Sequence, residues 1–422
     1  MTATEEPPAH ATGVHVGGFP CGDLTLLRFH VEQALATDTE GLSEAELVDQ
    51  IQEIESLQAS LAALQADRIR TFAQAHVENR RVDDRSDFDK IHRSVVAQIQ
   101  LACRVSTAEA RTRVANARDL HAGLDDVRCL HEAGQLSAAK VTAIAVECRD
   151  LNTTQRARVD ARLAAVRDLT RYGIGRLRAM TRRLVAEIAP DRFRARVHAA
   201  KAERRVTLRP APDAMSYLTA YVPVEQGAAC LAALQKAFVE AQVDPEPPTR
   251  TRGQVMADTL VERVTGQATA TAVNLKVQVT VPVQALLDPT SPLPAEIPGF
   301  GPVPADLLAN PEGTKSLRRL LTDQGLVIGG DSRRRTFTGL LATLVKARAQ
   351  NRCTEPYCDA PVRHLDHIRR DADGGRTELD NGRRVCEFHN HVREQPGWHI
   401  ARAPDGTVVT TTPTGHTYRG PD

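Results

Sequence analysis

The sequence has few aromatic residues and almost no net charge. Phenylalanine, tryptophan and tyrosine make up 4% of its 422 residues, and the formal net charge is +1. Overall charge therefore cannot attract a polyanion, and any nucleic-acid surface must come from local clusters of basic residues. Hydrophobic residues, at 41%, are sufficient for ordinary cores. A chain of this length is expected to form two or three domains.

Signals for export and for membrane insertion are also missing. The N-terminal stretch 1–19 is acidic and polar, without the basic start and apolar centre of a signal peptide. No apolar run approaches the length of about 18 residues that a membrane span needs. We therefore expect a soluble, cytoplasmic protein with no membrane partner. Because residues 1–19 show no periodicity, we expect them to be disordered.

Residues 20–200 are predicted to form a helical domain. Ser43 followed by Glu46, and Ser106 followed by Glu109, are capping boxes that predict helix starts. Apolar residues recur at helical spacing at Leu47, Ile51, Ile54, Leu57, Leu61, Leu64 and Phe72. This stripe favours one face of a helical bundle, with a coiled-coil seam as the alternative. The coiled-coil alternative leaves open that the chain forms a homo-oligomer through its N-terminal helices.

The pattern changes after Pro190, and residues 201–340 are predicted to form a mixed α+β domain. Two alternating segments around 205–210 and 215–222 read as strands joined by a turn, and 274–286 contains another strand. Prolines predict an irregular loop over 282–313. Basic residues cluster over 192–209, which fits either a phosphate-binding surface or a solvated helix face. The fold class is thus α+β and mostly helical.

Residues 341–422 are predicted to form a small C-terminal module that ends in a hairpin. It contains Cys353 and Cys358 four residues apart, then Cys386 and His389 two residues apart. Thiolate and imidazole are the ligands that zinc prefers, and a corner at Pro356–Tyr357 would close the wider first gap. A module this small has little core, so a structural Zn²⁺ is expected to supply folding energy.

A second reactive set lies between these ligands. Asp366 and Asn390 offer hard oxygen atoms suited to Mg²⁺, and His367 can deprotonate a water molecule. On a helix, adjacent residues point about 100° apart, so His389 can face the zinc while Asn390 faces another site. Because neighbours on a strand face opposite ways, Asp366 and His367 can share a site only at a bend or a strand end.

Over residues 350–400 the order of these motifs resembles the HNH nuclease family. The shared features are the cysteine pair, "LDHI", "GG-x-T", Asn381 and "C-x-x-H-N". The resemblance implies a ββα-metal fold, with Asp366 and Asn390 as ligands of a catalytic divalent metal, Mg²⁺ or Mn²⁺. It also implies His367 as the general base and Asn381 as a brace for its loop. Gly382 and Arg393 stand where the family commonly has leucine and lysine.

The whole chain is similar, more loosely, to actinobacterial proteins that join a long N-terminal domain of unknown function to a C-terminal HNH motif, including a mycobacterial repeat family. The resemblance implies a metal-dependent DNA endonuclease; the alternative is a non-catalytic zinc-containing protein that binds nucleic acid. DNA is the expected partner. Contacts to it are expected from arginines of the hairpin, for which a solvated loop is the other interpretation: Arg369, Arg370, Arg376, Arg383 and Arg384.

Overall fold

The structure is a computed structural model, in which the chain divides into two compact units, Met1–Gln58 and Ala59–Asp422. The expected disorder of residues 1–19 lies outside the described residues. The residues described are 21–80, 85–243, 249–270, 278–280, 291–297, 300–304, 318–320, 331–332, 336–347 and 351–420.

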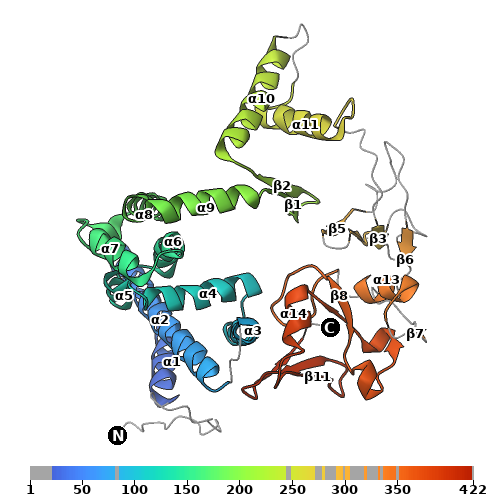
Figure 1. Cartoon of the computed structure of the whole chain (residues 1–422), viewed down its shortest axis with the longest axis horizontal. Coiled ribbons are helices and arrows are strands. Elements are labelled where there is room, and N and C mark those ends of the chain that lie inside the picture. The colour runs from blue at the N-terminus through green and yellow to red at the C-terminus, as the bar shows by residue number, and fades with distance from the viewer. Residues whose placement is uncertain are drawn as a thin grey trace. The chain divides into compact units, whose positions relative to one another are not determined.

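The first half of the chain is helical, as predicted (Figure 1). Its elements are α1 Cys21–Ala36, α2 Glu44–Glu78, α3 Arg85–Cys103, α4 Thr107–Leu120, α5 Asp125–Glu132, α6 Ala138–Cys148, α7 Thr153–Ala164, η1 Leu169–Arg171, α8 Ile174–Ile188 and α9 Pro190–Ala202. The capping box at the start of α2 is confirmed, because Ser43 and Glu46 exchange hydrogen bonds of 2.8 and 3.3 Å. Ser106 caps α4 by accepting from the Glu109 backbone, but the Glu109 carboxylate binds Arg113 instead of closing the box.

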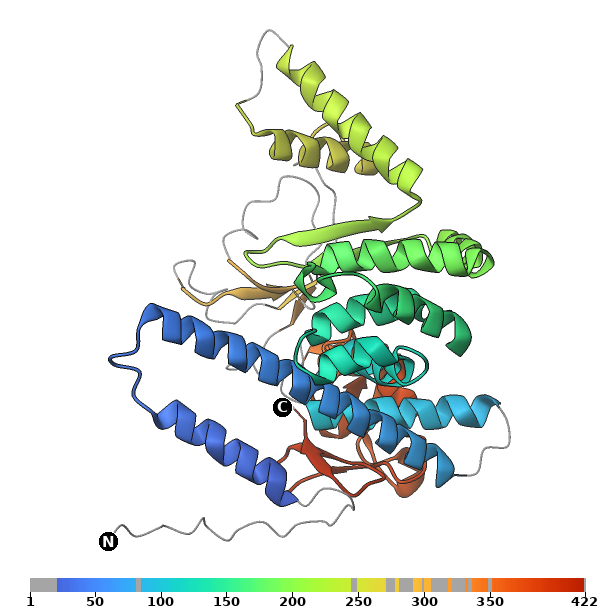
Figure 2. The ribbon, with the colours of Figure 1, turned by 90° about the vertical axis from the view of Figure 1, so that its left-hand side faces the viewer.

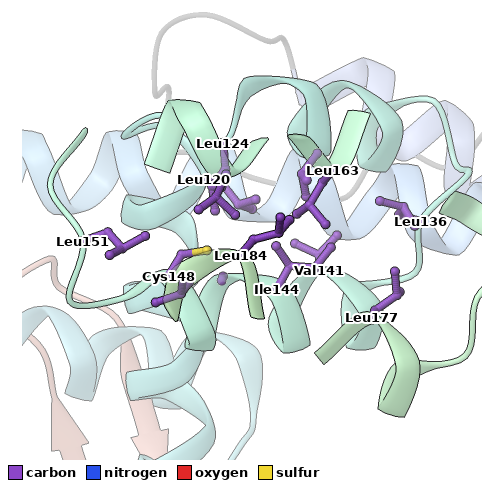
Figure 3. Close-up of a cluster of buried hydrophobic side chains, with 14 of the residues drawn as sticks. Leu120, Leu124, Leu136, Val141, Ile144, Cys148, Leu151, Leu163, Leu177 and Leu184 are labelled. Atoms are coloured by element: carbon purple, nitrogen blue, oxygen red, sulfur yellow. The ribbon is translucent and has the colours of Figure 1, made fainter. Parts of the chain in front are cut away.

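The largest core in the described residues lies within α4 to α8 (Figure 3). Leucine, isoleucine and valine side chains of these helices interdigitate there, and several are completely buried. The turn between α4 and α5 requires Gly123, which has a φ of +101° and whose added Cβ would lie 2.6 Å from the Thr153 carbonyl oxygen. This core fixes α4, and α4 in turn packs against α3.

The apolar stripe of α2 is not buried along its whole length. Ile51 is 65% exposed and Ile54 is 53% exposed, and fully buried positions of α2 begin at Ala59. For the first half of the stripe, which belongs to the other compact unit, the bundle face stays a prediction. Among the helices described, none is both long and apolar enough to cross a membrane.

The middle of the chain mixes short strands and helices, in line with the α+β expectation. Its elements are β1 Arg205–Pro210, β2 Ser216–Tyr221, α10 Val224–Gln242, α11 Arg252–Thr265, β3 Gln278–Thr280, β4 Ala295–Ile297, β5 Gly301–Val303 and β6 Arg318–Leu320. β3 to β6 form one sheet in the order β5-β4-β3-β6. Within the predicted irregular loop 282–313, the described residues 291–297 and 300–304 contain the β4–β5 hairpin, which corrects the prediction there, and the rest of the loop lies outside the described residues. Pro302 is tolerated in the hairpin because β5 is an edge strand.

The C-terminal part contains two small sheets, two helices and a short pairing between β7 and β9. Its elements are β7 Asp331–Ser332, α13 Gly339–Ala347, β8 His364–His367, η3 Asp371–Asp373, β9 Thr377–Glu378, η4 Leu379–Asn381, β10 Gly382–Val385, α14 Glu387–Val392, β11 His399–Arg402, β12 Val408–Thr411 and β13 Thr417–Arg419. β8 and β10 are antiparallel, and α14 follows them directly. The predicted terminal hairpin is extended by a third strand into the meander β11-β12-β13.

Helix α3 completes the core of this C-terminal part. Ala97 and Leu101 of α3 are buried against Val392 of α14 and against Trp398. The Trp398 indole also donates a hydrogen bond of 3.2 Å to the Ser94 hydroxyl. The expected domain boundaries at 200 and 340 stay predictions, but residues from both sides of them share one core.

A buried histidine beside Ser94 predicts how the stability of the protein depends on pH. His76 is buried beside Ser94, with 3.2 Å between Nε2 and Oγ, and burial, with a smaller effect of Arg80, lowers its pKa to about 4. The folded protein therefore holds His76 neutral, and this contribution is complete above pH ~6.5 and lost as the pH falls toward 4. Over that interval, the free energy of unfolding should fall by up to ~3 kcal/mol more in the parent than in His76→Gln, as measured by urea titration. Identical pH profiles of the two proteins would contradict this assignment.

Candidate metal centre and active site

The segment between Cys353 and Cys358 folds back on itself as a tight knuckle. Tyr357 has a φ of +62°, and the Cys358 backbone N–H donates to the Glu355 carbonyl at 3.1 Å. The Thr354 backbone N–H donates to the Arg384 carbonyl of β10 at 2.8 Å. The expected Pro356–Tyr357 corner is therefore present, and it holds the first cysteine pair against the strand that leads to the second pair.

The structure brings the four predicted zinc ligands together. The ligand atoms of Cys353, Cys358, Cys386 and His389 all lie within 4.8 Å of one another, and all four residues are buried. His389 Nδ1 is 3.5 Å from the Cys353 sulfur and 3.3 Å from the Cys386 sulfur. A tetrahedral zinc with Zn–S bonds of about 2.3 Å separates its ligands by about 3.8 Å. The cluster fits this geometry closely and could hold a structural metal such as zinc.

Electrostatics also favour a cation at this cluster. Hydrogen bonds with Cys353 and Cys358 lower the pKa of Cys386 far below its usual value, whereas those with Cys358 and Cys386 raise the pKa of Cys353. Burial lowers the pKa of His389, but hydrogen bonds with Cys358 and Cys386 outweigh it and raise that pKa to about 9. Three buried thiols this close cannot all ionise without a positive charge between them, which a divalent metal supplies.

A glutamine of α3 contacts the cluster from outside. Gln100 is completely buried, and its Oε1 atom lies 3.2 Å from His389 Nε2. The same amide donates to the Pro356 carbonyl at 3.0 Å and accepts from the Thr107 hydroxyl at 2.7 Å. With Nδ1 of His389 facing the metal, Nε2–H donates to Gln100, which fixes the ring orientation. The helical part of the chain therefore positions a ligand of the C-terminal cluster.

The structure places Asp366 and His367 in one cavity at the end of β8. The cavity has a volume of about 340 Å³, and both residues line it together with Phe337, Arg370 and other residues. His367 is the last residue of β8, opposite Gly382 of β10. Its ring Nε2 lies 2.9 Å from the Thr377 hydroxyl, and its centroid lies 4.7 Å from that of Phe337. Because β8 ends at His367, the alternation of side chains along a strand does not prevent Asp366 and His367 from lining the same cavity.

The Asp366 carboxylate already has two partners. Its Oδ1 atom accepts from the His367 backbone N–H at 2.8 Å, and its Oδ2 atom accepts from the Arg393 guanidinium. Arg393 also donates to the His367 and Ile368 carbonyl oxygens, and burial lowers its own pKa. Each carboxylate oxygen retains a second lone pair, so these contacts leave room for a further ligand.

Asn381 bridges both ends of the loop that follows β8. Its Oδ1 atom accepts from the Arg369 backbone N–H at 2.9 Å, and its Nδ2 atom donates to the Arg369 and Arg376 carbonyl oxygens at 3.0 and 2.7 Å. Gly375 is required here, because an added Cβ would lie 1.9 Å from the Arg369 carbonyl oxygen. These contacts fix the loop shape beside His367; the effect of Asn381 on catalysis stays a prediction.

Asn390 is not brought into the same cavity. It lies half-buried on α14, next to His389, and it is absent from the residues that line the cavity of Asp366 and His367. Two other carboxylates line that cavity instead, those of Asp371 and Glu394. The cavity lining therefore gives no support to Asp366 and Asn390 as a ligand pair, and that pair stays a prediction.

The five arginines expected to contact DNA fall into two groups. Arg369, Arg370 and Arg376 are exposed and line a groove of about 1010 Å³, which Arg402 and other residues complete. Arg370 also lines the cavity of Asp366 and His367, so groove and cavity adjoin.

The other two arginines are interior, which corrects their assignment to substrate. Arg383 is 2% exposed and donates to the Glu355 carboxylate of the knuckle at 3.0 Å. Arg384 is also buried and donates to the Val345 carbonyl at 3.1 Å. Both lie on β10, where they join the knuckle and α13 to the strand.

Some residues of the site gave no signal in the sequence. Gln100, Thr377 and Phe337 carry no motif, and only their contacts reveal them. The charge of Arg393 was noted, but not its bond to Asp366. Arg402 was missed altogether, although its position on a C-terminal strand could have marked it as a basic residue near the hairpin.

The fold and the site together define the class of protein: a mostly helical chain with small sheets and a buried Cys₃His cluster. The chain belongs to the family described as "Domain of unknown function (DUF222)", whose sequence pattern matches residues 48–302, more than half of its length. The matched range ends before Cys353, so the cluster lies outside it.

Relatives from Mycobacterium tuberculosis agree with this family. "Uncharacterized protein Rv3776" is 34% identical over 134 residues, which cover 30% of this chain and 24% of the relative. "Uncharacterized protein Rv2100" is 33% identical over 136 residues, which cover 31% and 24%. The matched part thus spans about a quarter of the length of these relatives. No solved structure matches the chain.

Removing one thiol should empty the metal centre. In Cys358→Ser, zinc measured by elemental analysis should fall from about one per chain to near zero. The thermal midpoint should drop by several degrees, because metal binding supplies folding energy. Cys230→Ser removes an exposed free thiol of α10 and is the matched control, which should keep both values. Equal zinc content in the two variants would contradict the assignment.

Gln100 should set how tightly the metal is held. Gln100→Ala removes the acceptor for His389 Nε2, and losing such a contact typically lowers metal affinity about 10–100-fold. Competition with a chromophoric chelator measures the change. Gln98→Ala is the control on the same helix, since Gln98 binds Thr414 of the C-terminal part rather than the cluster. Indistinguishable metal affinities would refute this role of Gln100.

Proposed function

We propose that this protein is a metal-dependent endonuclease of the HNH type that hydrolyses DNA phosphodiester bonds. The observation that carries the proposal is the cavity at the end of β8. There Asp366 and His367 lie side by side on the β8–β10 hairpin, which leads into the Cys₃His cluster, and the cavity adjoins a groove lined by five arginines and four acidic residues. Antiparallel β8 and β10 followed by α14 agree with the ββα order that the sequence resemblance implies.

In this proposal His367 accepts the proton of the attacking water. Nε2 of His367 lies 2.9 Å from the Thr377 hydroxyl, a contact that fixes the orientation of the ring in the cavity. Phe337 packs against the ring and limits its rotation. Asn381 and Gly375 keep the following loop in one shape. Arg369 and Arg376 would offer positive charge to the DNA backbone, and Arg370 would have to exchange its ion pair with Glu394 for a phosphate.

Asp366 and a second carboxylate of the cavity, Asp371 or Glu394, would hold a divalent cation. When bound, such an ion would stabilise negative charge on the phosphate and on the leaving oxygen. Asn390 is outside the lining, so its expected role as the second ligand has no support from this geometry.

A non-catalytic zinc protein that binds nucleic acid is the second candidate. The bond between Arg393 and Asp366 favours it, because a guanidinium already neutralises the carboxylate that a metal would use. The arginine-lined groove serves either function. Cleavage therefore has to be measured directly.

The test is nicking of supercoiled plasmid with added Mg²⁺, Mn²⁺ or EDTA. His367→Ala should lower the rate about 10²–10⁴-fold, the usual cost of losing a general base, with zinc content and thermal midpoint unchanged. His364→Ala is the matched control, because His364 is exposed on the same strand. Equal cleavage by His367→Ala and the parent would exclude His367 as the base. No cleavage by the parent, with DNA binding retained, would establish the second candidate.

A further inference from the structure

The β1–β2 hairpin is a two-stranded ribbon with two different faces. It follows α9 and leads into α10 (Figure 2), and its six residue pairs are in antiparallel register from Arg205–Tyr221 to Pro210–Ser216. All twelve residues of the two strands are exposed. Because side chains alternate along each strand, the ribbon separates them into two sets.

One face of the ribbon carries arginine, tyrosine and threonine. Its cross-strand pairs are Arg205 with Tyr221, Thr207 with Thr219 and Arg209 with Tyr217. The guanidinium carbon of Arg205 lies 4.7 Å from the Tyr221 ring centroid, and that of Arg209 lies 5.2 Å from the Tyr217 centroid. The opposite face carries apolar residues such as Val206, Leu208 and Leu218.

The two guanidiniums are held in place without losing their charge. Within the described part of the chain, neither Arg205 nor Arg209 forms an ion pair with a carboxylate; Arg205 donates to the backbone carbonyl of Glu203 at 3.1 Å. Stacking on tyrosine orders each side chain, while the edge of the guanidinium keeps its N–H donors. The ribbon therefore presents two ordered, unneutralised forks on one exposed face.

We propose that the arginine–tyrosine face of the β1–β2 ribbon docks onto duplex DNA. The major groove of B-DNA admits a two-stranded β-ribbon, and arginine forks match both phosphate oxygens and the guanine edge. Basic residues that precede the ribbon, among them Arg192 of α9 and Arg204, extend the positive charge along the chain, whereas Lys201 is paired with Glu225. This inference rests on the proposed function in taking DNA as the ligand, and it adds a binding element outside the hairpin that holds His367.

Duplex DNA suits this face better than a single strand. Proteins that bind single strands stack successive bases on exposed aromatic rings. Here the guanidinium of the cross-strand partner lies over one face of each tyrosine ring, so a base could stack only on the other face. What the ribbon offers is guanidinium donors, and these recognise the phosphates and groove edges of a duplex.

The test uses the full chain carrying His367→Ala, so that binding is measured without cleavage. Fluorescence anisotropy with a labelled duplex of about 20 base pairs, and with one of its strands alone, gives both affinities over a range of salt. Arg205→Ala/Arg209→Ala should weaken duplex binding about tenfold or more and reduce the slope of log affinity against log salt by about 2. Thermal melting of each variant checks that the chain remains folded.

Two control variants test whether the loss of binding is specific to the two ribbon arginines, and not a general effect of removing positive charge or of altering the ribbon. Arg167→Ala/Arg171→Ala removes two arginines whose side chains are 97% and 79% exposed, and duplex affinity should stay as in the parent. Leu208→Ser/Leu218→Ser alters the opposite face of the same strands and should also leave duplex affinity unchanged.

The remaining outcomes concern the double arginine variant, the single strand and the apolar face of the ribbon. Unchanged affinity and salt slope in the double arginine variant would overturn it, as would a parent that binds no DNA. Tighter binding of the single strand, lost equally in that variant, would overturn the duplex assignment. A change of molecular mass by light scattering in Leu208→Ser/Leu218→Ser alone would make the ribbon a protein interface. If the double arginine variant loses duplex binding and the parent cleaves no plasmid, the ribbon proposal is upheld and only the proposed nuclease activity is refuted.

Discussion

Three cysteines and a histidine confined within a few ångströms impose the constraint on which the C-terminal part of this chain depends. Their sulfur and nitrogen atoms lie close enough for one metal ion to bind all four, and the residues around them bury few large apolar side chains. The cluster joins the knuckle at Cys353–Cys358 to the end of β10 and the start of α14. Whatever holds those three elements together also determines where β8 ends.

This dependence extends to the candidate active site through Arg393. That guanidinium follows α14, whose first turn contains His389, and it donates to Asp366 and to the carbonyl oxygens of His367 and Ile368. The end of β8 is thus held by a residue that follows the helix carrying His389 of the cluster. A disturbance at the cluster would reach Asp366 and His367 through one side chain, with no direct contact needed between the two centres.

Local signals in the sequence were sufficient for much of this. The spacing of the cysteines predicted the cluster, and Ser43 with Glu46 predicted the start of α2. The alternation of side chains along a strand required a bend or a strand end at Asp366 and His367. These features depend on residues close together in the chain, whose geometry follows from covalent structure and hydrogen bonding.

What the sequence could not predict depends on contacts between distant residues. Gln100 and His389 are 289 positions apart, and nothing in either segment announces the other. Arg383 and Arg384 looked like a basic patch because their charge is visible in the sequence, whereas their burial is decided by the knuckle and α13. The exposed first half of the α2 stripe is the reverse case, since apolar periodicity states that a face needs a partner but not where that partner is.

The packing of α3 against Trp398 restricts how such a chain can be rearranged. Ala97, Leu101 and Ser94 contribute to the interior of a segment that begins some 250 residues later. Moved to an unrelated partner without α3, that segment would lose these contacts and leave Val392 and Trp398 more exposed. In natural variants, a larger side chain at Ala97 should be accompanied by a smaller one at Val392 or Trp398. Substitutions in α3 and in the C-terminal part should therefore be correlated.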